Sequence, residues 1–217
     1  MRYDKFRNLP TKGTVSECPQ CDKTLIAKCG NRKVHHWAHK SLIDCDPWWE
    51  PMSEWHLNWQ EKVAPEFREI KMANHRADVQ LPNGRVVEFQ YSSLSEDEVF
   101  ERENFYNELT WVWDARKFQK NFTFWEKDAT HTFYWRRPRH HIATCTKTVY
   151  LDFGETIFKV KKFNPKEIER NYGGNKYTTI RYGGWGYMLD REEAYHWIFG
   201  KHYLPTVQLE DELRQTA

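Results

Sequence analysis

The segment His75–Ser93, with the sequence HRADVQLPNGRVVEFQYSS, decides the fold in the middle of this chain. Two valine-containing runs flank the turn residues Leu81–Gly84, so the segment reads as a β-hairpin. Pro at the second turn position, followed by a glycine suited to the left-handed conformation, favours a three-residue loop with a bulge. That loop pairs Leu81 with Arg85 and thereby fixes the register of both strands.

The register decides whether two acidic residues share a face of the hairpin. In the bulged form Asp78 lies opposite Glu88, whereas a two-residue Asn-Gly loop pairs Val79 with Glu88 and sends the acids to opposite faces. The proline favours the first form. Gln90 projects from the same strand face as Glu88. Two carboxylates on a rigid sheet are what a hard divalent cation needs, as in a metal-dependent phosphodiesterase. An ordinary exposed hairpin with scattered acids is the alternative.

The surroundings of the hairpin predict an α-β-β-β-α-β order around a short mixed sheet. Ser53 is suited to cap a helix that Pro65 ends, and residues 66–72 read as the first strand. A capping box at Ser95 begins a second helix, and residues 108–113 read as a last buried strand. We therefore expect an α+β fold.

The second helix is expected to pack through an apolar face. That face contains Val99, Phe100 and Phe105. Glu98 and Glu101 are interpreted as part of its solvated face.

Length and composition limit the classes of protein. A chain of 217 residues can bury one good core with a small satellite domain. It has no transmembrane run and no apolar signal region at its start, so we expect a cytoplasmic protein with no membrane partner. The formal charge of +2 hides basic clusters at 28–40 and 136–141 and an acidic run at 96–103.

A Cys- and His-rich segment precedes the hairpin region. Its C-x-x-C turn and its histidines three residues apart, placed on one helical turn, predict a closed structural Zn²⁺ site made by Cys18, Cys21, His36 and His39. The possible substitutes are His35 and Cys45, with Cys29 less favoured. A redox-active thiol pair is the alternative, but the segment lacks a thioredoxin-like context.

Several motifs together resemble the CoiA-like competence proteins. The segment CPQCDKTLIAKCGNRKVHHWAH is similar to their N-terminal zinc-finger-like module, and SEWHL to a helix motif in which Gln60 stands where a lysine is common. HRADV, VVEFQYSSLS and FERENFY resemble their nuclease core. The resemblance covers about residues 14–115, with the motifs in the family's order.

The resemblance implies a restriction-endonuclease-like core of the PD-(D/E)XK superfamily. In that superfamily the matching acids, here Asp78 and Glu88, hold Mg²⁺ or Mn²⁺. Gln90 occupies the usual lysine position; an uncharged amide can orient a water, so the ion must do more of the activation. The carbonyl of Phe89 is a further expected ligand.

Further residues are expected to support catalysis or binding. The candidates for substrate contact are Arg76, Ser92, Ser93, Arg102, Tyr106 and His56. For His56, a role in packing is an equal alternative. For the pair of Arg102 and Tyr106, the alternative is that they brace the sheet. Glu54 and Glu61 are more simply explained as solvated than as outer metal contacts.

The sequence thus predicts three regions and one function. The regions are a zinc-finger-like module (1–48), the nuclease-like core (49–115) and a β-rich C-terminal region with a terminal helix (116–217). In the last region, the basic stretch 136–141, the lysines 159, 161 and 162, and the glycine- and aromatic-rich stretch 182–187 are suited to contacting nucleic acid or to ordinary strand packing.

The predicted function is metal-dependent hydrolysis of nucleic acid, DNA rather than RNA, in recombination, DNA processing or defence. The alternatives are a nucleic-acid-binding module without turnover and, last, a zinc-dependent interaction protein. The sequence does not indicate an oligomeric state.

Overall fold

The computed structural model describes residues 1–31, 34–41, 45–48, 52–173 and 175–205, so part of the basic cluster 28–40 and the end of the predicted C-terminal region (206–217) lie outside the described residues. The chain forms two compact units, Met1–Val87 with Lys201–Ala217, and Glu88–Gly200. The boundary falls inside one strand of the hairpin. Among the helices of the described residues, none has the length and apolar character that a membrane span requires.

The first unit begins with a three-stranded antiparallel sheet. Its strands are β1 (Val15–Glu17), β2 (Thr24–Lys28) and β3 (His36–His39), in the order β1-β2-β3. A small core of Met1, Cys18, Leu25 and Trp37 lies beneath it. So small a core gains little from apolar burial, which is consistent with the need for a metal to hold this segment.

The remainder of the first unit contains the predicted helix and the predicted hairpin. Helix α1 (Glu54–Gln60) is capped by Ser53 as predicted, but it ends before Pro65, which instead begins the short 3-10 helix η1 (Pro65–Phe67). Strands β4 (Arg68–Met72), β5 (His75–Gln80) and the start of β6 (Val86–Gln90) follow in antiparallel order. A 3-10 helix, η3 (Gly200–His202), lies at the end of the described chain.

The hairpin has the predicted turn and register. The amide of Gly84 donates to the carbonyl of Leu81 at 2.9 Å, and the amide of Leu81 donates to the carbonyl of Arg85 at 2.9 Å. Gly84 has a φ of +84°, the left-handed conformation expected of the bulge residue. Val79 pairs with Val87 and Gln80 with Val86, which is the register of the bulged form.

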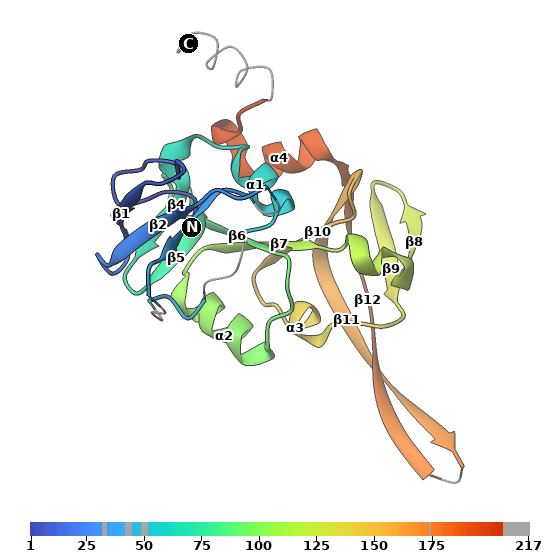
Figure 1. Ribbon diagram of the computed structural model, residues 1–217. Helices are drawn as coiled ribbons and strands as arrows, with labels where there is room; N and C mark the ends of the chain where they lie inside the picture. The colour runs from blue at the N-terminus through green and yellow to red at the C-terminus, as the bar shows by residue number, and fades with distance from the viewer. Residues whose placement is uncertain (32–33, 42–44, 49–51, 174, 206–217) are drawn as a thin grey trace. The chain divides into compact units, whose positions relative to one another are not determined.

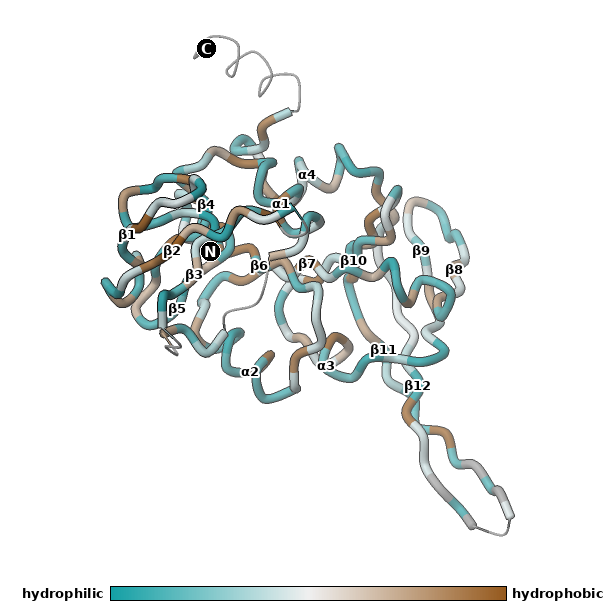
Figure 2. Tube along the Cα trace, viewed as in Figure 1, coloured by the Kyte–Doolittle hydropathy of each residue, from teal (hydrophilic) through white to brown (hydrophobic). Residues whose placement is uncertain are grey.

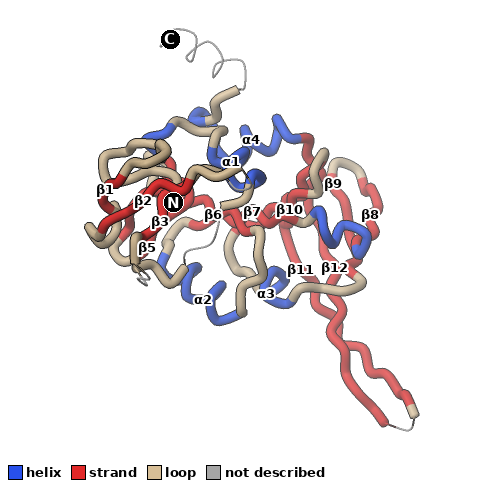
Figure 3. The backbone as a smooth tube through the Cα atoms, in the orientation of Figure 1, coloured by secondary structure: helices blue, strands red, loops and turns tan. Residues whose placement is uncertain are grey.

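The second unit contains α2 (Glu96–Phe105), β7 (Leu109–Asp114), η2 (Arg116–Asn121), β8 (Phe122–Lys127), β9 (Thr130–Trp135), α3 (His140–Ala143), β10 (Thr148–Asp152), β11 (Thr156–Tyr172), β12 (Asn175–Asp190) and α4 (Arg191–Phe199). Its strands form one mixed sheet in the order β7-β10-β11-β12-β9-β8, in which β10 runs parallel to β7 and the other pairs are antiparallel. Figure 3 shows β11 and β12 continuing as strands well beyond the others.

Along the chain, the elements α1, β4, β5, β6, α2 and β7 follow the predicted α-β-β-β-α-β order, and the mixture of sheet and helix confirms the α+β class. The C-terminal region is rich in strands and contains the helix α4. The restriction-endonuclease-like architecture and the three-region division stay predictions.

Helix α2 packs differently from the predicted apolar face. Its capping box is present, with the Ser95 amide donating to Glu98 at 2.8 Å and the Glu98 amide to Ser95 at 3.1 Å. The buried residues are Val99, Arg102 and Glu103, whereas Phe100 is 67% exposed. Positions i, i+3 and i+4 share one side of a helix, so a face centred on Val99 excludes Phe100.

Candidate functional site

Asp78 lies on β5 within reach of two side chains of helix α1. The Nε2 of His56 is 3.0 Å from the Asp78 Oδ1, and both side chains are largely buried. The Nε2 of Gln60 donates to the Asp78 carbonyl at 3.1 Å, and Gln60 is fully buried. Ser53 fixes the start of the helix by accepting a hydrogen bond from the His56 amide at 3.2 Å. The helix motif therefore positions the backbone and one carboxylate oxygen of Asp78.

This arrangement can orient a carboxylate for metal binding. A carboxylate has two oxygens, and an imidazole next to one of them restricts the rotation of the group. Hydrogen-bonding partners of this kind commonly hold ligating carboxylates in place. His56 thus contacts the predicted site residue directly, which favours the site interpretation over simple packing.

Glu88 lies in the second unit and is 4% exposed. Its Oε2 is 3.5 Å from the Arg102 Nη1, and the Arg102 side chain is similarly buried. A buried carboxylate is costly unless it is paired or binds a metal, and the guanidinium partly compensates its charge. Arg102 therefore braces Glu88.

The residues that follow Glu88 have distinct environments. The ring of Phe89 packs edge-on against Phe199, with 6.4 Å between the ring centroids. Gln90 is 2% exposed, and its Nε2 donates to the carbonyl and to the Oγ of Ser92, each at 3.3 Å. The Gln90 amide is thus held in one orientation, as required of a group that positions a water.

The basic stretch 136–141 contacts the segment that follows strand β6. The Arg139 Nη1 donates to the Ser93 Oγ at 3.3 Å, and its guanidinium lies over the Phe118 ring, 4.3 Å from the centroid. The sequence indicated the serine as a candidate for substrate contact, and the basic stretch as suited either to contacting nucleic acid or to ordinary strand packing. The contact joins positions 46 residues apart, so no local pattern indicated it.

Three other predicted residues have less direct relations to the acids. Tyr106 is 1% exposed, which favours the bracing interpretation over substrate contact. Arg76 is half-buried on β5. Burial, then the N-terminal amine, and then the charge of Arg76 lower the pKa of His39. Glu61 forms an ion pair with Arg2 at 2.8 Å, which favours a structural role.

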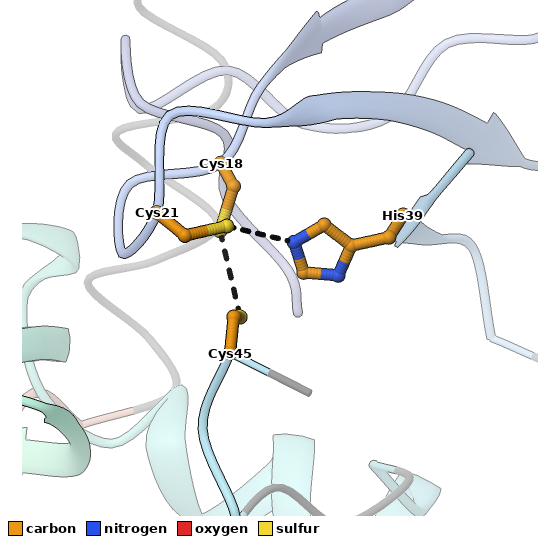
Figure 4. A group of neighbouring side chains, drawn as sticks. All are labelled: Cys18, Cys21, His39 and Cys45. Atoms are coloured by element: carbon orange, nitrogen blue, oxygen red, sulfur yellow. Dashed lines mark hydrogen bonds between the residues drawn. The ribbon is translucent and has the colours of Figure 1, made fainter. Parts of the chain in front are cut away.

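The Cys/His segment brings four ligand atoms together in the first unit. Figure 4 shows Cys18, Cys21, His39 and Cys45 converging, and their ligand atoms all lie within 4.8 Å of one another. The Cys18 and Cys45 sulfurs are 4.0 Å apart, and the Cys21 sulfur is 3.3 Å from the His39 Nε2. Zinc bonds of about 2.3 Å to sulfur and about 2.0 Å to nitrogen give tetrahedral edges of about 3.8 and 3.5 Å. The group fits a closed structural zinc site.

The fourth member of this group differs from the predicted one. Cys45, considered only a substitute, takes the place of His36. The prediction assumed that His36 and His39 share a helical turn, but both lie on strand β3, where residues three apart point to opposite faces. The His36 Nδ1 lies 2.8 Å from the Val34 carbonyl instead.

Without a metal, the thiol of Cys45 holds its proton tightly. Burial, together with the neighbouring Cys18 and Cys21, raises the pKa of Cys45 to about 12. Burial, the N-terminal amine and Arg76 also lower the pKa of His39, which keeps its ring neutral. Zinc ligation requires thiolates and neutral imidazole, so zinc binding here displaces protons.

Comparisons with known protein families agree with this arrangement. The family model described as the N-terminal domain of competence protein CoiA matches residues 10–47, which include all four members of the Cys/His group. The model described as the nuclease-like domain of competence protein CoiA matches residues 51–179, which include Asp78, Glu88 and the contacts described around them. No curated protein and no solved structure matches the chain.

The chain is thus an α+β protein with a Cys/His group suited to zinc and a nuclease-like domain. It belongs to the CoiA-like competence protein family.

Proposed function

We propose that this protein is a metal-dependent nuclease that hydrolyses phosphodiester bonds of nucleic acid, with DNA as the expected substrate. Asp78 and Glu88 would hold Mg²⁺ or Mn²⁺, with the Phe89 carbonyl as a further ligand. The bound ion supplies Lewis-acid polarisation of the phosphate and a water of lowered pKa. Gln90 would orient that water through its fixed amide, and the Arg139 and Ser93 pair would bind a phosphate oxygen of the substrate.

The register of the hairpin is the observation that carries this proposal. The pairs Val79 with Val87 and Gln80 with Val86 belong to the bulged form. If this register continued by one residue on each strand, Asp78 would pair with Glu88 on one face, as the sequence predicts. In the alternative register the two acids would face opposite sides, and no shared ion would be possible.

The contact between His56 and Asp78 adds independent support. A 3.0 Å approach of an imidazole to one oxygen of a carboxylate restricts the rotation of that carboxylate. The buried amide of Gln60 fixes the backbone at the same residue. Helix α1 thus contacts both the side chain and the backbone of Asp78.

We further propose that the group of Cys18, Cys21, His39 and Cys45 binds one structural Zn²⁺. Four protein ligands fill the tetrahedron, so the ion has no open position for catalysis. The zinc then stabilises the small N-terminal core.

Cleavage assays test the nuclease proposal. Purified protein is incubated with labelled single-stranded, double-stranded and branched DNA, and with RNA, in Mg²⁺ or Mn²⁺. We expect divalent-ion-dependent cleavage by the wild type and none by Asp78→Ala or Glu88→Ala. Asp97→Asn and Glu101→Gln, exposed acids on α2, are matched controls that retain activity.

Two outcomes contradict the proposal in different ways. Cleavage that persists in both Asp78→Ala and Glu88→Ala refutes the site. Absence of cleavage on every substrate, with tight binding retained, favours a binding module that lacks turnover.

A further inference from the structure

Strands β11 and β12 form a long hairpin whose outer part pairs only with itself in the described chain. Strand β10 pairs with β11 from Ile157 to Val160, and β9 pairs with β12 from Tyr182 to Gly186. Beyond these residues the two strands continue to pair with each other as far as the turn. We call the segment from Lys161 to Tyr182 the arm (Figure 1). A two-stranded ribbon with no covering layer is only marginally stable in water, so a partner is expected.

One face of the arm carries two cations directly opposite each other. Lys166 pairs with Arg181 across the ribbon, and two like charges directly opposite each other are destabilising. Lys162 lies on the same face by strand alternation, whereas Glu167, Glu169 and Lys176 lie on the other. Among the described residues, no carboxylate forms an ion pair with the three cations of the first face.

A groove at the base of the arm is also basic. The strands change register between Val160 and Lys162, which makes Lys161 an extra, bulged residue. A regular strand would send Lys161 and Lys162 to opposite faces, but both line this groove, together with Lys147. None of the residues that line it is acidic. The bulge therefore gathers positive charge where strand alternation alone would divide it.

The base of the arm is connected to the end of strand β6 through the basic stretch. Arg139 donates to Ser93, and the ring of the next residue, His140, lies 5.6 Å from the ring of Tyr182 at the base of the arm. Arg139 and His140 thus connect, within one unit, the proposed phosphate-binding serine and the base of the arm.

We propose that the arm and its basal groove bind the phosphate backbone of duplex nucleic acid and anchor the substrate away from the bond that is cut. This inference rests on the proposed function for its ligand. The nine residues from Asn164 to Tyr172 span about 30 Å at about 3.4 Å each. A two-stranded ribbon fits a major groove about 12 Å wide. Figure 2 shows that hydrophilic and intermediate residues predominate along the arm, which suits phosphate better than an apolar protein partner.

Salt-dependent binding tests this inference separately from cleavage. Affinity for a labelled duplex is measured between 50 and 200 mM salt without added divalent ion, using the full chain. The variants are Lys161→Ala/Lys162→Ala in the groove and Lys166→Ala/Arg181→Ala on the arm. Lys120→Ala/Lys127→Ala removes the same charge from exposed positions elsewhere in the unit. Circular dichroism and light scattering check folding and oligomeric state.

Each test variant should lose two phosphate contacts. The slope of log affinity against log salt should then become shallower by about 1.8. Between 50 and 200 mM salt, each test variant should therefore lose about 12-fold less affinity than the wild type loses. The control should keep the wild-type slope. Unchanged slopes in both test variants would overturn the arm proposal, and so would no binding by the wild type. A wild-type dimer that both test variants convert to a monomer would also overturn it.

The two proposals fail in distinguishable ways. Binding that weakens in the arm variants, when the wild type cuts no substrate in Mg²⁺ or Mn²⁺, supports the arm and contradicts the nuclease. Cleavage by the wild type with unchanged slopes in the arm variants supports the nuclease and contradicts the arm.

Discussion

Replacing Cys45 should release zinc, whereas replacing His36 should not. Both side chains are half-buried and both belong to the Cys/His-rich segment, but only the Cys45 sulfur lies within 4.8 Å of the other three ligand atoms. The pair Cys45→Ala and His36→Ala is therefore a matched comparison of the ligand that the structure favours with the one that local sequence spacing favours.

The magnitude of this effect follows from the number of ligands. Structural zinc sites bind with about 10–16 kcal/mol near pH 7, so one ligand of four contributes on the order of 3–4 kcal/mol. At about 1.4 kcal/mol per factor of ten, Cys45→Ala should weaken zinc binding by roughly 100- to 1,000-fold. His36→Ala should change it by less than about threefold, since His36 points to the other face of β3.

Mass spectrometry of the metal content and competition with a chromogenic chelator measure this difference. We expect about one zinc per wild-type and His36→Ala chain, and a zinc in Cys45→Ala that is lost at far lower chelator concentration. Zinc retained by Cys45→Ala and lost by His36→Ala would refute the ligand assignment. Zinc absent from the purified wild type would refute the site as a whole.

Two further predictions concern the second unit. Gly186→Ala should destabilise the protein by at least about 1–3 kcal/mol in urea unfolding, because a Cβ there would overlap the carbonyl oxygen of Lys159. The control Gly30→Ala, with open space around it, should change stability by less than about 0.5 kcal/mol. Equal effects of the two substitutions would contradict the close approach at Gly186. Burial, Arg139 and His140 lower the pKa of His141 to about 4. As the pH falls, the unfolded chain therefore binds this proton before the folded chain does. The free energy of unfolding should decrease by about 1 kcal/mol between about pH 6.5 and about pH 4, after allowance for solvent screening. His141→Gln should remove this contribution while His196→Gln, an exposed control, keeps it; identical pH profiles for the wild type and His141→Gln would refute it.

Local features of this fold were predictable because local physics determines them. The turn at Leu81–Gly84 fixes its own register through a proline and a left-handed glycine, so four residues were sufficient. The caps at Ser53 and Ser95 were predictable for the same reason, since a capping side chain bonds to an amide three residues away.

Features that depend on distant contacts were not predictable in this way. The choice between His36 and Cys45 depends on whether residues 36–39 form a helical turn or a strand, and that follows from pairing with β2. The contact of Arg139 with Ser93 joins residues far apart in the sequence. For the stretch 182–187 the sequence left nucleic-acid contact and strand packing open, and in the structure Gly184 and Gly186 allow neighbouring strands to approach closely within a sheet.

The arm shows the limit of reading charge from sequence alone. Lys161 and Lys162 are adjacent, and strand alternation predicts that they face apart. One bulged residue brings both into the same groove. Neither the bulge nor the length of the unsupported ribbon leaves a local signal.

Binding of Mn²⁺ tests the central claim most directly, because it asks whether Asp78 and Glu88 hold one ion together. Electron paramagnetic resonance titration of the zinc-loaded protein counts the bound Mn²⁺, and Asp78→Asn, Glu88→Gln and the control Asp97→Asn are compared. The account predicts a bound ion in the wild type and in Asp97→Asn that is lost in each of the other two variants. Equal Mn²⁺ binding by all four proteins, or no binding by the wild type, would contradict it.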